Sequence, residues 1–269
     1  MAQETFAFSS SALRSLRLQR ELLEREDRRR ALARESATRR FLPEPPRPPR
    51  RPQYCRDPAV HNALYTGDLL RIKSIFKDET TTNLVMETVS EELVWEPEQD
   101  HTPLHNACGN GQPRLARLLL WHGADATVPN CAGYTPLDCA LHAVDEYRDQ
   151  RPEETIALLL DHGAGPVHPK MLKFCCRHPP ALEVVLNAYD RIPPAESWVG
   201  AVPPELWQEH REFYTSAVRM AGQPRRLQHL ARCAVRRHLG ARCHLAVPKL
   251  SLPPALRRYL QLPLQGTLS

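Results

Sequence analysis

HTPLHNACGNGQPRLARLLLWHGA at residues 101–124 and YTPLDCALHAVDEYRDQRPEETIALLLDHGA at residues 134–164 are two copies of one pattern. Thr102-Pro103-Leu104 returns 33 residues later as Thr135-Pro136-Leu137, whereas the Leu-Leu-Leu and His-Gly-Ala blocks return 40 residues later. The difference of seven residues is an insertion around 145–151, between the two helices of the later copy. Self-similarity at a period near 33 residues predicts a stack of two-helix units.

Each repeated position of the pattern has a structural role. The Thr hydroxyl can cap the first helix, and the Pro suits its first turn, where a backbone N–H would have no partner. The Leu points inward, the His is expected to form hydrogen bonds between neighbouring turns, and the Gly can take the left-handed conformation that ends the second helix. We therefore assign the scaffold of the repeats to Thr102, Pro103, Leu104, His105, Gly123, Thr135, Pro136, Leu137 and Gly163.

Weaker copies flank this pair. Residues 57–78 keep the spacing of its His, Ala and Gly and form a degenerate repeat, and residues 166–190 hold a degenerate helix pair, so the main array covers 101–190. Residues 79–100 carry apolar side chains suited to a strand or a helix but show no repeat pattern. This irregular junction passes straight into a late-type repeat, which indicates a shortened array near the minimum of about three repeats that a stable stack needs.

The Thr-Pro-Leu-His tetrapeptide at 102–105, the 33-residue period and the Leu-Leu-Leu-x-His-Gly-Ala block resemble the ankyrin repeat. The resemblance implies an all-α fold, an α-solenoid whose stacked repeats offer a binding surface to another protein.

A basic block follows the repeats. Residues 191–222 contain an amphipathic linking helix at 204–220, and another helix is predicted over 224–239, between Pro224 and Gly240. The arginines of this second helix lie largely off its apolar face, which consists of Leu227, Leu230, Ala231, Ala234, Val235 and Leu239. Because so short a segment buries little apolar surface alone, this face must dock on the repeats, on a partner, or on both.

Residues 223–265 resemble the SOCS box, in which a Leu-x-x-x-Cys helix inserts into elongin C and a Leu-Pro-rich element faces a cullin. The resemblance implies elongin contacts at Leu227, Leu230, Ala231 and Val235, and cullin contacts at Leu252, Pro253 and Pro254. Two residues depart from the family pattern: Arg226 replaces a small residue or Pro, and Ala231 replaces the Cys. Since Ala in a Cys-sized pocket loses less than a Leu→Ala change, we expect weakened rather than absent binding.

Repeats followed by this tail are similar to the family of ankyrin repeat and SOCS box proteins. The resemblance implies a non-enzymatic, substrate-recognition adaptor of a ubiquitin ligase. Its partners would be elongin C, elongin B, cullin-5 with its RING-box protein, and an unidentified substrate protein. Its chemistry would be proximity, because the adaptor raises the local concentration of substrate lysines near a ubiquitin-charged enzyme. The alternative is a non-ligase ankyrin scaffold whose tail merely caps the stack.

The net charge of +5 combines unlike blocks, with +7 in residues 1–56, −11 in 57–219 and +9 in 220–269. Within 1–56 we expect a partly formed Arg-rich helix over 11–40 and a Pro-rich spacer over 41–53. Because the predicted folded block is acidic, charge argues against a nucleic acid as partner and favours a basic patch on the substrate.

Other functional classes lack their sequence patterns. No Cys-x-x-Cys pair supports zinc at 175–178 or around Cys233 and Cys243, and no nucleotide-binding loop or nucleophile motif occurs, so we expect no catalytic residue, metal or cofactor. No apolar stretch approaches the ~18 residues of a membrane span, and the first residues lack a secretory pattern. Eight cysteines without a disulfide framework are typical of a reduced protein of the cytoplasm or nucleus, away from membranes.

Overall fold

The computed structural model describes residues 53–89, 95–97, 101–165, 167–266 and 268. The chain divides into two units, Met1–Pro45 and Pro46–Ser269, and all described residues belong to the second. The expected helix over 11–40 and nearly all of the expected spacer over 41–53 lie outside the described residues.

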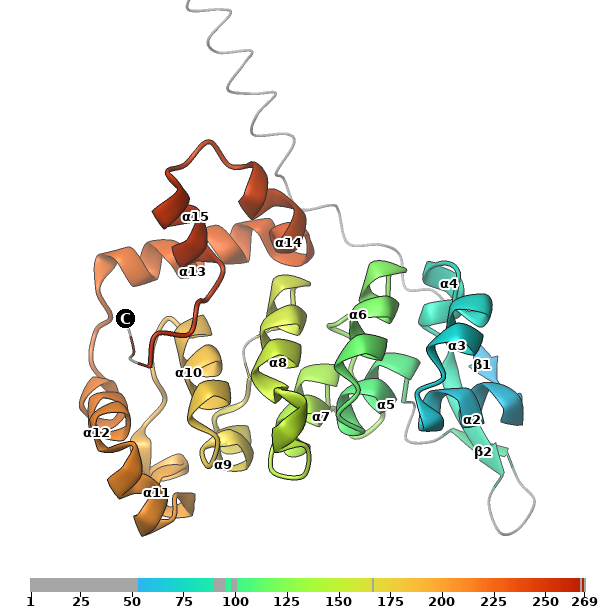
Figure 1. Ribbon diagram of the computed structural model, residues 1–269, viewed down its shortest axis with the longest axis horizontal. Helices are drawn as coiled ribbons and strands as arrows, with labels where there is room; N and C mark the ends of the chain where they lie inside the picture. Colours follow the sequence, from blue (N-terminus) through green and yellow to red (C-terminus); the bar gives the residue numbers. More distant parts are fainter. Residues whose placement is uncertain (1–52, 90–94, 98–100, 166, 267, 269) are drawn as a thin grey trace, which may run out of the picture. The chain divides into compact units, whose positions relative to one another are not determined.

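Pairs of short helices follow one another along the repeats (Figure 1). Successive pairs pack side by side, as the contacts of α5 with α7 and of α8 with α10 show. The predicted all-α solenoid is therefore confirmed. The helices are α2 (Pro58–Thr66), α3 (Leu69–Ile75), α5 (Pro103–Gly109), α6 (Pro113–Trp121), α7 (Pro136–His142), α8 (Pro152–Asp161), α9 (Leu172–Cys175, preceded by the 3-10 turn η2, Pro169–Met171) and α10 (Pro179–Ala188).

The core of the stack is aliphatic and continuous from one pair to the next. Leu104 and Leu137, the leucines of the two Thr-Pro-Leu steps, are fully buried, as are Leu119 and Leu159 of the second helices. Burying one such side chain stabilises the fold by roughly 1.5–3 kcal/mol relative to leaving it in water. The small side chain of Ala107 is also fully buried, which lets α5 pack closely against its neighbours.

Local hydrogen bonds begin the first helices of the two strong repeats. Thr135 caps α7: its Oγ1 accepts the Asp138 N–H at 3.3 Å, and the Asp138 carboxylate accepts the Thr135 N–H at 2.9 Å. In α5 the same position holds His105, whose Nδ1 accepts the Thr102 N–H at 3.1 Å. Its Nε2–H donates to the Tyr134 carbonyl at 3.1 Å, so this histidine also joins one repeat to the next.

Short strands lie before and within the junction between the first two repeats. Residues 79–89 and 95–97 form α4 (Glu79–Thr82), β2 (Val85–Val89) and β3 (Trp95–Pro97). Strand β1 (Tyr54–Cys55) pairs parallel with β2, with Tyr54 opposite Val85, and β2 pairs antiparallel with β3. The Met86 N–H donates to the His101 carbonyl at 2.9 Å, and the Met86 side chain is fully buried. A residue of the junction thus contributes to the core.

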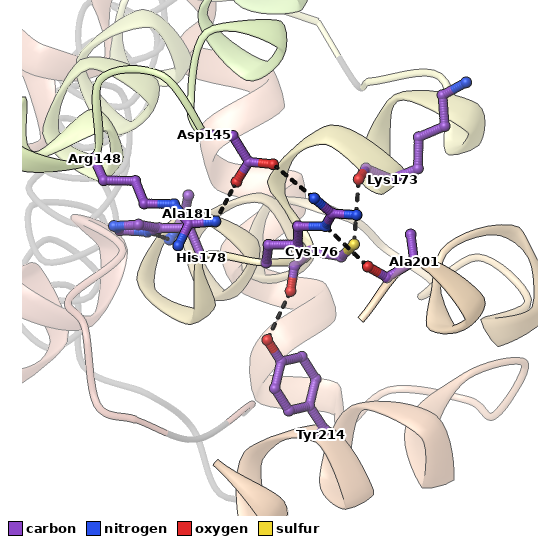
Figure 2. Close-up of polar contacts among 9 residues, drawn as sticks. Asp145, Arg148, Lys173, Cys176, His178, Ala181, Ala201 and Tyr214 are labelled. Carbon is purple, nitrogen blue, oxygen red and sulfur yellow. Dashed lines mark hydrogen bonds and ion pairs between the residues drawn. The ribbon is translucent and has the colours of Figure 1, made fainter. Parts of the chain in front are cut away.

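The linking segment contains η3 (Ala195–Ser197), η4 (Val199–Ala201), α11 (Pro204–Glu209) and α12 (Arg211–Met220). The single helix predicted over 204–220 is wrong, because the backbone leaves the helical region at His210 (φ −113°, ψ 37°). The Trp207 and Tyr214 rings stack across this break, with centroids 5.1 Å apart. The buried Tyr214 hydroxyl donates to the Cys176 carbonyl at 2.7 Å, which ties α12 to the last repeat (Figure 2).

The insertion after α7 also contacts the last repeat. It contains the 3-10 turn η1 (Arg148–Gln150), and Arg148 donates to Asp145 at 2.7 Å (Figure 2). The other carboxylate oxygen of Asp145 lies 3.8 Å from the Arg177 guanidinium, which itself donates to the Ala201 carbonyl at 3.1 Å. Polar contacts thus connect the insertion, the last repeat and the linking segment.

The C-terminal block folds into short helices beside the ends of α8 and α10 (Figure 1). Helix α13 begins at Leu227, three residues after the predicted start at Pro224, and Arg225 before it donates to the Leu186 carbonyl of α10. Among the described residues, no helix is both long and apolar enough to cross a membrane. The elements are α13 (Leu227–Leu239), η5 (Gly240–Arg242), α14 (Cys243–Ala246), η6 (Val247–Lys249) and α15 (Pro254–Leu260).

Candidate protein-interaction site

Helix α13 turns most of its predicted apolar face outward, although Leu239 at its end is buried. Leu227 is 82% exposed, and Leu230 and Val235 remain 38% and 36% exposed. Ala231 and Ala234 are exposed on the same side. The four residues that the SOCS-box resemblance assigns to elongin, Leu227, Leu230, Ala231 and Val235, therefore lie together on one open face. We call this set the outward face.

The opposite side of α13 is buried and polar. Arg225, just before the helix, is 6% exposed, and His229 and Arg232 are 0% and 3% exposed. This is the reverse of an ordinary surface helix, which buries its apolar residues and leaves its charges in water. Buried guanidinium groups carry a high desolvation cost unless each finds hydrogen-bond acceptors.

The acceptors for these guanidinium groups come from the end of α10. Arg225 donates to the Leu186 carbonyl at 3.3 Å, and Arg232 donates to the carbonyl and to the side-chain oxygen of Asn187, both at 3.2 Å. The last carbonyls of a helix have no partner within the helix and carry partial negative charge. The arginines therefore donate hydrogen bonds to carbonyls of α10 that would otherwise lack a partner, and those carbonyls supply the acceptors that the buried guanidinium groups need.

His229 completes the buried network as a neutral imidazole. Its Nε2–H donates to the Tyr189 carbonyl at 2.6 Å, so its Nδ1 is an acceptor. Nδ1 accepts from Arg225 at 3.2 Å and from Arg232 at 2.9 Å. Burial, reinforced by the two guanidinium charges, lowers the pKa of His229 to about 4. The neutral form that the network needs is therefore the stable one near pH 7.

Sequence reasoning missed this network, although its spacing was visible. Arg225, His229, Arg232 and Arg236 stand at i, i+4, i+7 and i+11, which is one side of a helix. A stripe of basic residues is ordinarily a solvated face, and nothing local showed that the end of α10 would cover it. The signal was the strict periodicity of the polar residues, opposite an equally periodic apolar stripe.

Further contacts hold α13 and its neighbours to the repeats. Arg236 forms a 2.6 Å ion pair with Asp161 at the end of α8 and donates to the Leu260 carbonyl of α15 at 2.7 Å. The His162 and His244 rings stack with centroids 3.9 Å apart. The orientation of α13 is thus defined from α8, from α10 and from α15.

After α15 the chain contacts the repeats again through Gln265, Gly266 and Leu268, and we call this segment the strap. The carboxylate of Glu183, a buried residue of α10, accepts the Gln265 N–H at 2.6 Å and the Gly266 N–H at 3.0 Å. The side chain of Leu268 packs into the core cluster of the repeats. The strap therefore anchors the far end of the C-terminal block.

The residues assigned to a cullin lie at the start of α15. Pro253 occupies the N-cap position of this helix and Pro254 is its first residue, and both are exposed. Leu252 is 37% exposed and Leu256 is 42% exposed. This second open apolar patch lies at the start of α15 rather than on α13. The residues expected to contact elongin and those expected to contact a cullin therefore lie on different helices.

The cysteines show no metal-binding or nucleophilic arrangement. Among the described residues, no group of three or more His, Cys, Asp or Glu side chains is placed to hold a metal ion. Cys175 and Cys233 are buried, and burial raises the pKa of each thiol, so both are protonated near neutral pH. Cys176 is buried as well, with its pKa raised to about 11. Protonated thiols are neither good ligands nor good nucleophiles.

Comparison with known proteins defines the family. The SOCS box profile matches residues 223–261, and the profile of ankyrin repeats (3 copies) matches residues 59–170. Ankyrin repeat and SOCS box protein 16 of Mus musculus and that of Homo sapiens are each 34% identical over 450 residues, covering 99% of this chain and 99% of the relative. Ankyrin repeat and SOCS box protein 10 of Homo sapiens is 39% identical over 170 residues, covering 62% of this chain and 36% of that protein. The chain belongs to the family of ankyrin repeat and SOCS box proteins.

The length of the alignment bears on the repeat array. It runs over 450 positions, whereas this chain has 269 residues, so long stretches of the relatives have no counterpart here. That the missing stretches are repeats stays a prediction from the sequence. Membership of the family supports the role of a non-catalytic, substrate-recognition adaptor of a cullin–RING ubiquitin ligase.

Proposed function

We propose that this chain is the substrate-recognition subunit of a ubiquitin ligase built on elongin B, elongin C, cullin-5 and a RING-box protein. The observation that carries the proposal is the outward face of α13: an apolar stripe left in water by a helix whose other side is fully engaged. The repeats would hold the substrate, and the C-terminal block would hold the ligase.

The energetics favour a protein partner on the outward face. Contiguous exposed apolar side chains on a folded protein commonly mark an interaction site. Covering Leu227 alone would stabilise a complex by roughly 1.5–3 kcal/mol. Because the buried network with α10 fixes the other side, α13 cannot rotate to hide this stripe without removing the acceptors of Arg225 and Arg232. The stripe is therefore available to elongin C.

The two departures from the family pattern fall at the contact itself. Arg226 is the N-cap residue of α13, beside Leu227, and Ala231 lies within the outward face. Ala231 leaves unfilled part of the volume that a Cys occupies in the family pattern. The elongin complex of this chain would therefore be weaker than that of a relative with Cys at this position, but it would keep the anchoring leucines.

Cullin-5 would contact the exposed Leu252, Pro253 and Pro254 at the start of α15. Two partners on separate elements give an arrangement in which each contact can be tested alone. The function that follows is proximity, because a substrate on the repeats becomes a neighbour of the ubiquitin-charged enzyme. This role belongs to the cytoplasm or nucleus, and the eight free thiols suit such a reducing compartment.

The test is co-purification with elongin B and elongin C. Leu227→Asp should reduce the recovered complex at least about tenfold, because it removes apolar contact and would bury a charge. Leu245→Asp is the matched control, since Leu245 is a 50% exposed leucine of α14 outside the outward face. Leu245→Asp should bind elongins like the wild type.

Other outcomes would replace the proposal. If the wild type does not recover the elongins, or if Leu227→Asp recovers them equally well, the chain is an ankyrin scaffold outside the ligase system. For the second contact, Leu252→Asp should keep elongin B and elongin C and lose cullin-5. Equal recovery of cullin-5 by this variant would exclude the start of α15 as its site.

A further inference from the structure

Two hollows join into one groove along the first helices of the repeats. A hollow of about 710 Å³ lies between α2 and α5, and one of about 210 Å³ lies between α5 and α7. His101, Gly109 and Cys139 line both, so the two are continuous. We call the whole the inner groove. Its smaller end accommodates a single long side chain rather than a folded domain.

The groove bears negative charge at one end. Asp138 and Glu146 line the smaller hollow, and none of the described residues that line either hollow is Lys or Arg. Both hydrogen bonds that Asp138 accepts from Thr135 use Oδ2. Oδ1 has no hydrogen-bond donor among the described residues, so it is available to a ligand. A positively charged side chain is the complement of this end of the groove.

An unpaired buried donor lies in the same wall. Asn130 lines the smaller hollow and is 5% exposed, and its Oδ1 accepts the Tyr134 N–H at 2.8 Å. That bond orients the amide, and within the described part of the chain its Nδ2 has no hydrogen-bond partner. An unmet buried donor is unfavourable, so a carbonyl oxygen of a bound peptide would remove a cost that the free protein carries.

Exposed tyrosines stand in both hollows. Tyr65 of α2 is 78% exposed and lines the larger hollow, and Tyr134 is 49% exposed and lines the smaller one. Tyrosine is enriched where proteins meet, because its ring buries a large area and accepts stacking by a cation. These side chains suit an extended segment that passes over the groove.

We propose that the inner groove binds an extended segment of the substrate protein with a Lys or Arg side chain between Asp138 and Glu146. A backbone carbonyl of the segment accepts from Asn130 Nδ2, and Tyr134 flanks the basic side chain. Tyr65 contacts the segment at the other end. The inference rests on the proposed function, because it names the class of sequence that the adaptor selects for ubiquitin transfer.

The experiment uses the full chain in complex with elongin B and elongin C. The probes are fluorescein-labelled peptides of equal length in which glycine alternates with lysine, with glutamate or with serine, and binding is followed by fluorescence anisotropy. The lysine peptide should bind, and the other two should bind at least about tenfold more weakly. Glu146→Gln and Asp138→Asn should each weaken the lysine peptide about fivefold. Tyr134→Ala should also weaken it.

The matched control is Glu205→Gln, which removes the same charge from an exposed position on α11, away from the groove. It should bind the lysine peptide like the wild type. Equal loss with Glu205→Gln and Glu146→Gln would mean attraction to an acidic protein in general and would overturn the proposal, as would no measurable binding of the lysine peptide.

The two proposals fail separately. The groove variants should recover elongin B and elongin C normally. Loss of peptide binding at the groove with normal elongin recovery in the wild type would overturn the groove alone. If the wild type does not bind elongins, the peptide titration is run on the chain without them, and groove-specific binding would then leave a peptide-binding scaffold.

Discussion

Gly163 ends α8 with φ +90°, and its missing side chain makes room for the C-terminal block. A Cβ atom placed there would lie 2.8 Å from the backbone nitrogen of Ala241. The glycine of the repeat pattern therefore has a second purpose at this position. It ends the helix, and it lets the residues after α13 approach the repeats.

Gly163→Ala should separate these two effects when compared with Gly133→Ala. Gly133 has φ +82° and nothing within 4 Å of its hypothetical Cβ, so its replacement measures the backbone strain, about 1 kcal/mol. Gly163→Ala adds a backbone clash and should lower the free energy of unfolding by about 2–4 kcal/mol. Urea denaturation of both variants gives the values. Equal losses would show that Ala241 moves away freely.

His229 offers a second test at the scale of one residue. His229→Leu removes the acceptor shared by Arg225 and Arg232 and the donor to the Tyr189 carbonyl. Each buried group left without its partner costs about 1–3 kcal/mol, so we expect a loss near 3 kcal/mol in the free energy of unfolding. His238→Leu, an exposed histidine of the same helix, is the control and should change stability by less than about 0.5 kcal/mol.

The helices show which features local sequence determines. The caps at Thr135, the helix-ending Gly123 (φ +93°) and the alternation of buried leucines depend on residues within one or two turns, and the repeat pattern predicted them. The outward stripe of α13 was also predicted, because its period is a property of the helix alone. The period alone does not decide whether this stripe docks on the repeats, on a partner, or on both.

Other features depend on residues far apart in the chain, and the sequence did not predict them. The break at His210 lets Tyr214 reach the carbonyl of Cys176, 38 residues earlier. Arg225 finds its acceptor at Leu186, 39 residues earlier. Periodicity shows that a face exists but not what covers it, so the apolar face was identified and the polar network was not.

The strap after α15 is the element whose attachment is most easily tested. Glu183→Ala removes the carboxylate that accepts from the Gln265 and Gly266 N–H groups. Both amides should then exchange with deuterium at least about tenfold faster, measured by hydrogen exchange of the C-terminal peptide. Amides within α13 should keep their protection, because Asn187, Tyr189 and Asp161 hold that helix independently. Unchanged exchange at Gln265 would show that packing of Leu268 alone secures the strap.

At the scale of the molecule, the repeats and the C-terminal block carry net charges of opposite sign. Residues 57–219 carry net −11 and include the inner groove, whereas residues 220–269 carry +9. Part of that positive charge is directed inward by α13, where Arg225 and Arg232 meet the end of α10. Arg236 also forms a 2.6 Å ion pair with Asp161 of α8, and this pair joins the basic block to the acidic one. The groove keeps a negative end for its proposed ligand.

Two buried histidines make the stability of the whole molecule depend on pH. Burial lowers the pKa of His105 to about 4, and burial with neighbouring guanidinium charges does the same for His229. Unfolded histidine has a pKa near 6.5, so between about pH 6.5 and about pH 4 the unfolded chain binds more protons than the folded chain. Stability from these residues is complete above pH 6.5 and is lost as the pH falls toward 4.

The expected loss is up to about 3 kcal/mol for each histidine across that interval. Glu183 opposes it in part, because burial raises the pKa of its carboxyl and protonation of that group on acidification favours the folded state. Urea denaturation at a series of pH values measures the slope. His229→Gln, which keeps a donor and an acceptor but does not titrate, should reduce the slope without abolishing it, because burial also lowers the pKa of His105, His162 and His178. A slope identical to that of the wild type would mean that His229 is charged within the folded protein, in conflict with the hydrogen bonds that its Nδ1 accepts.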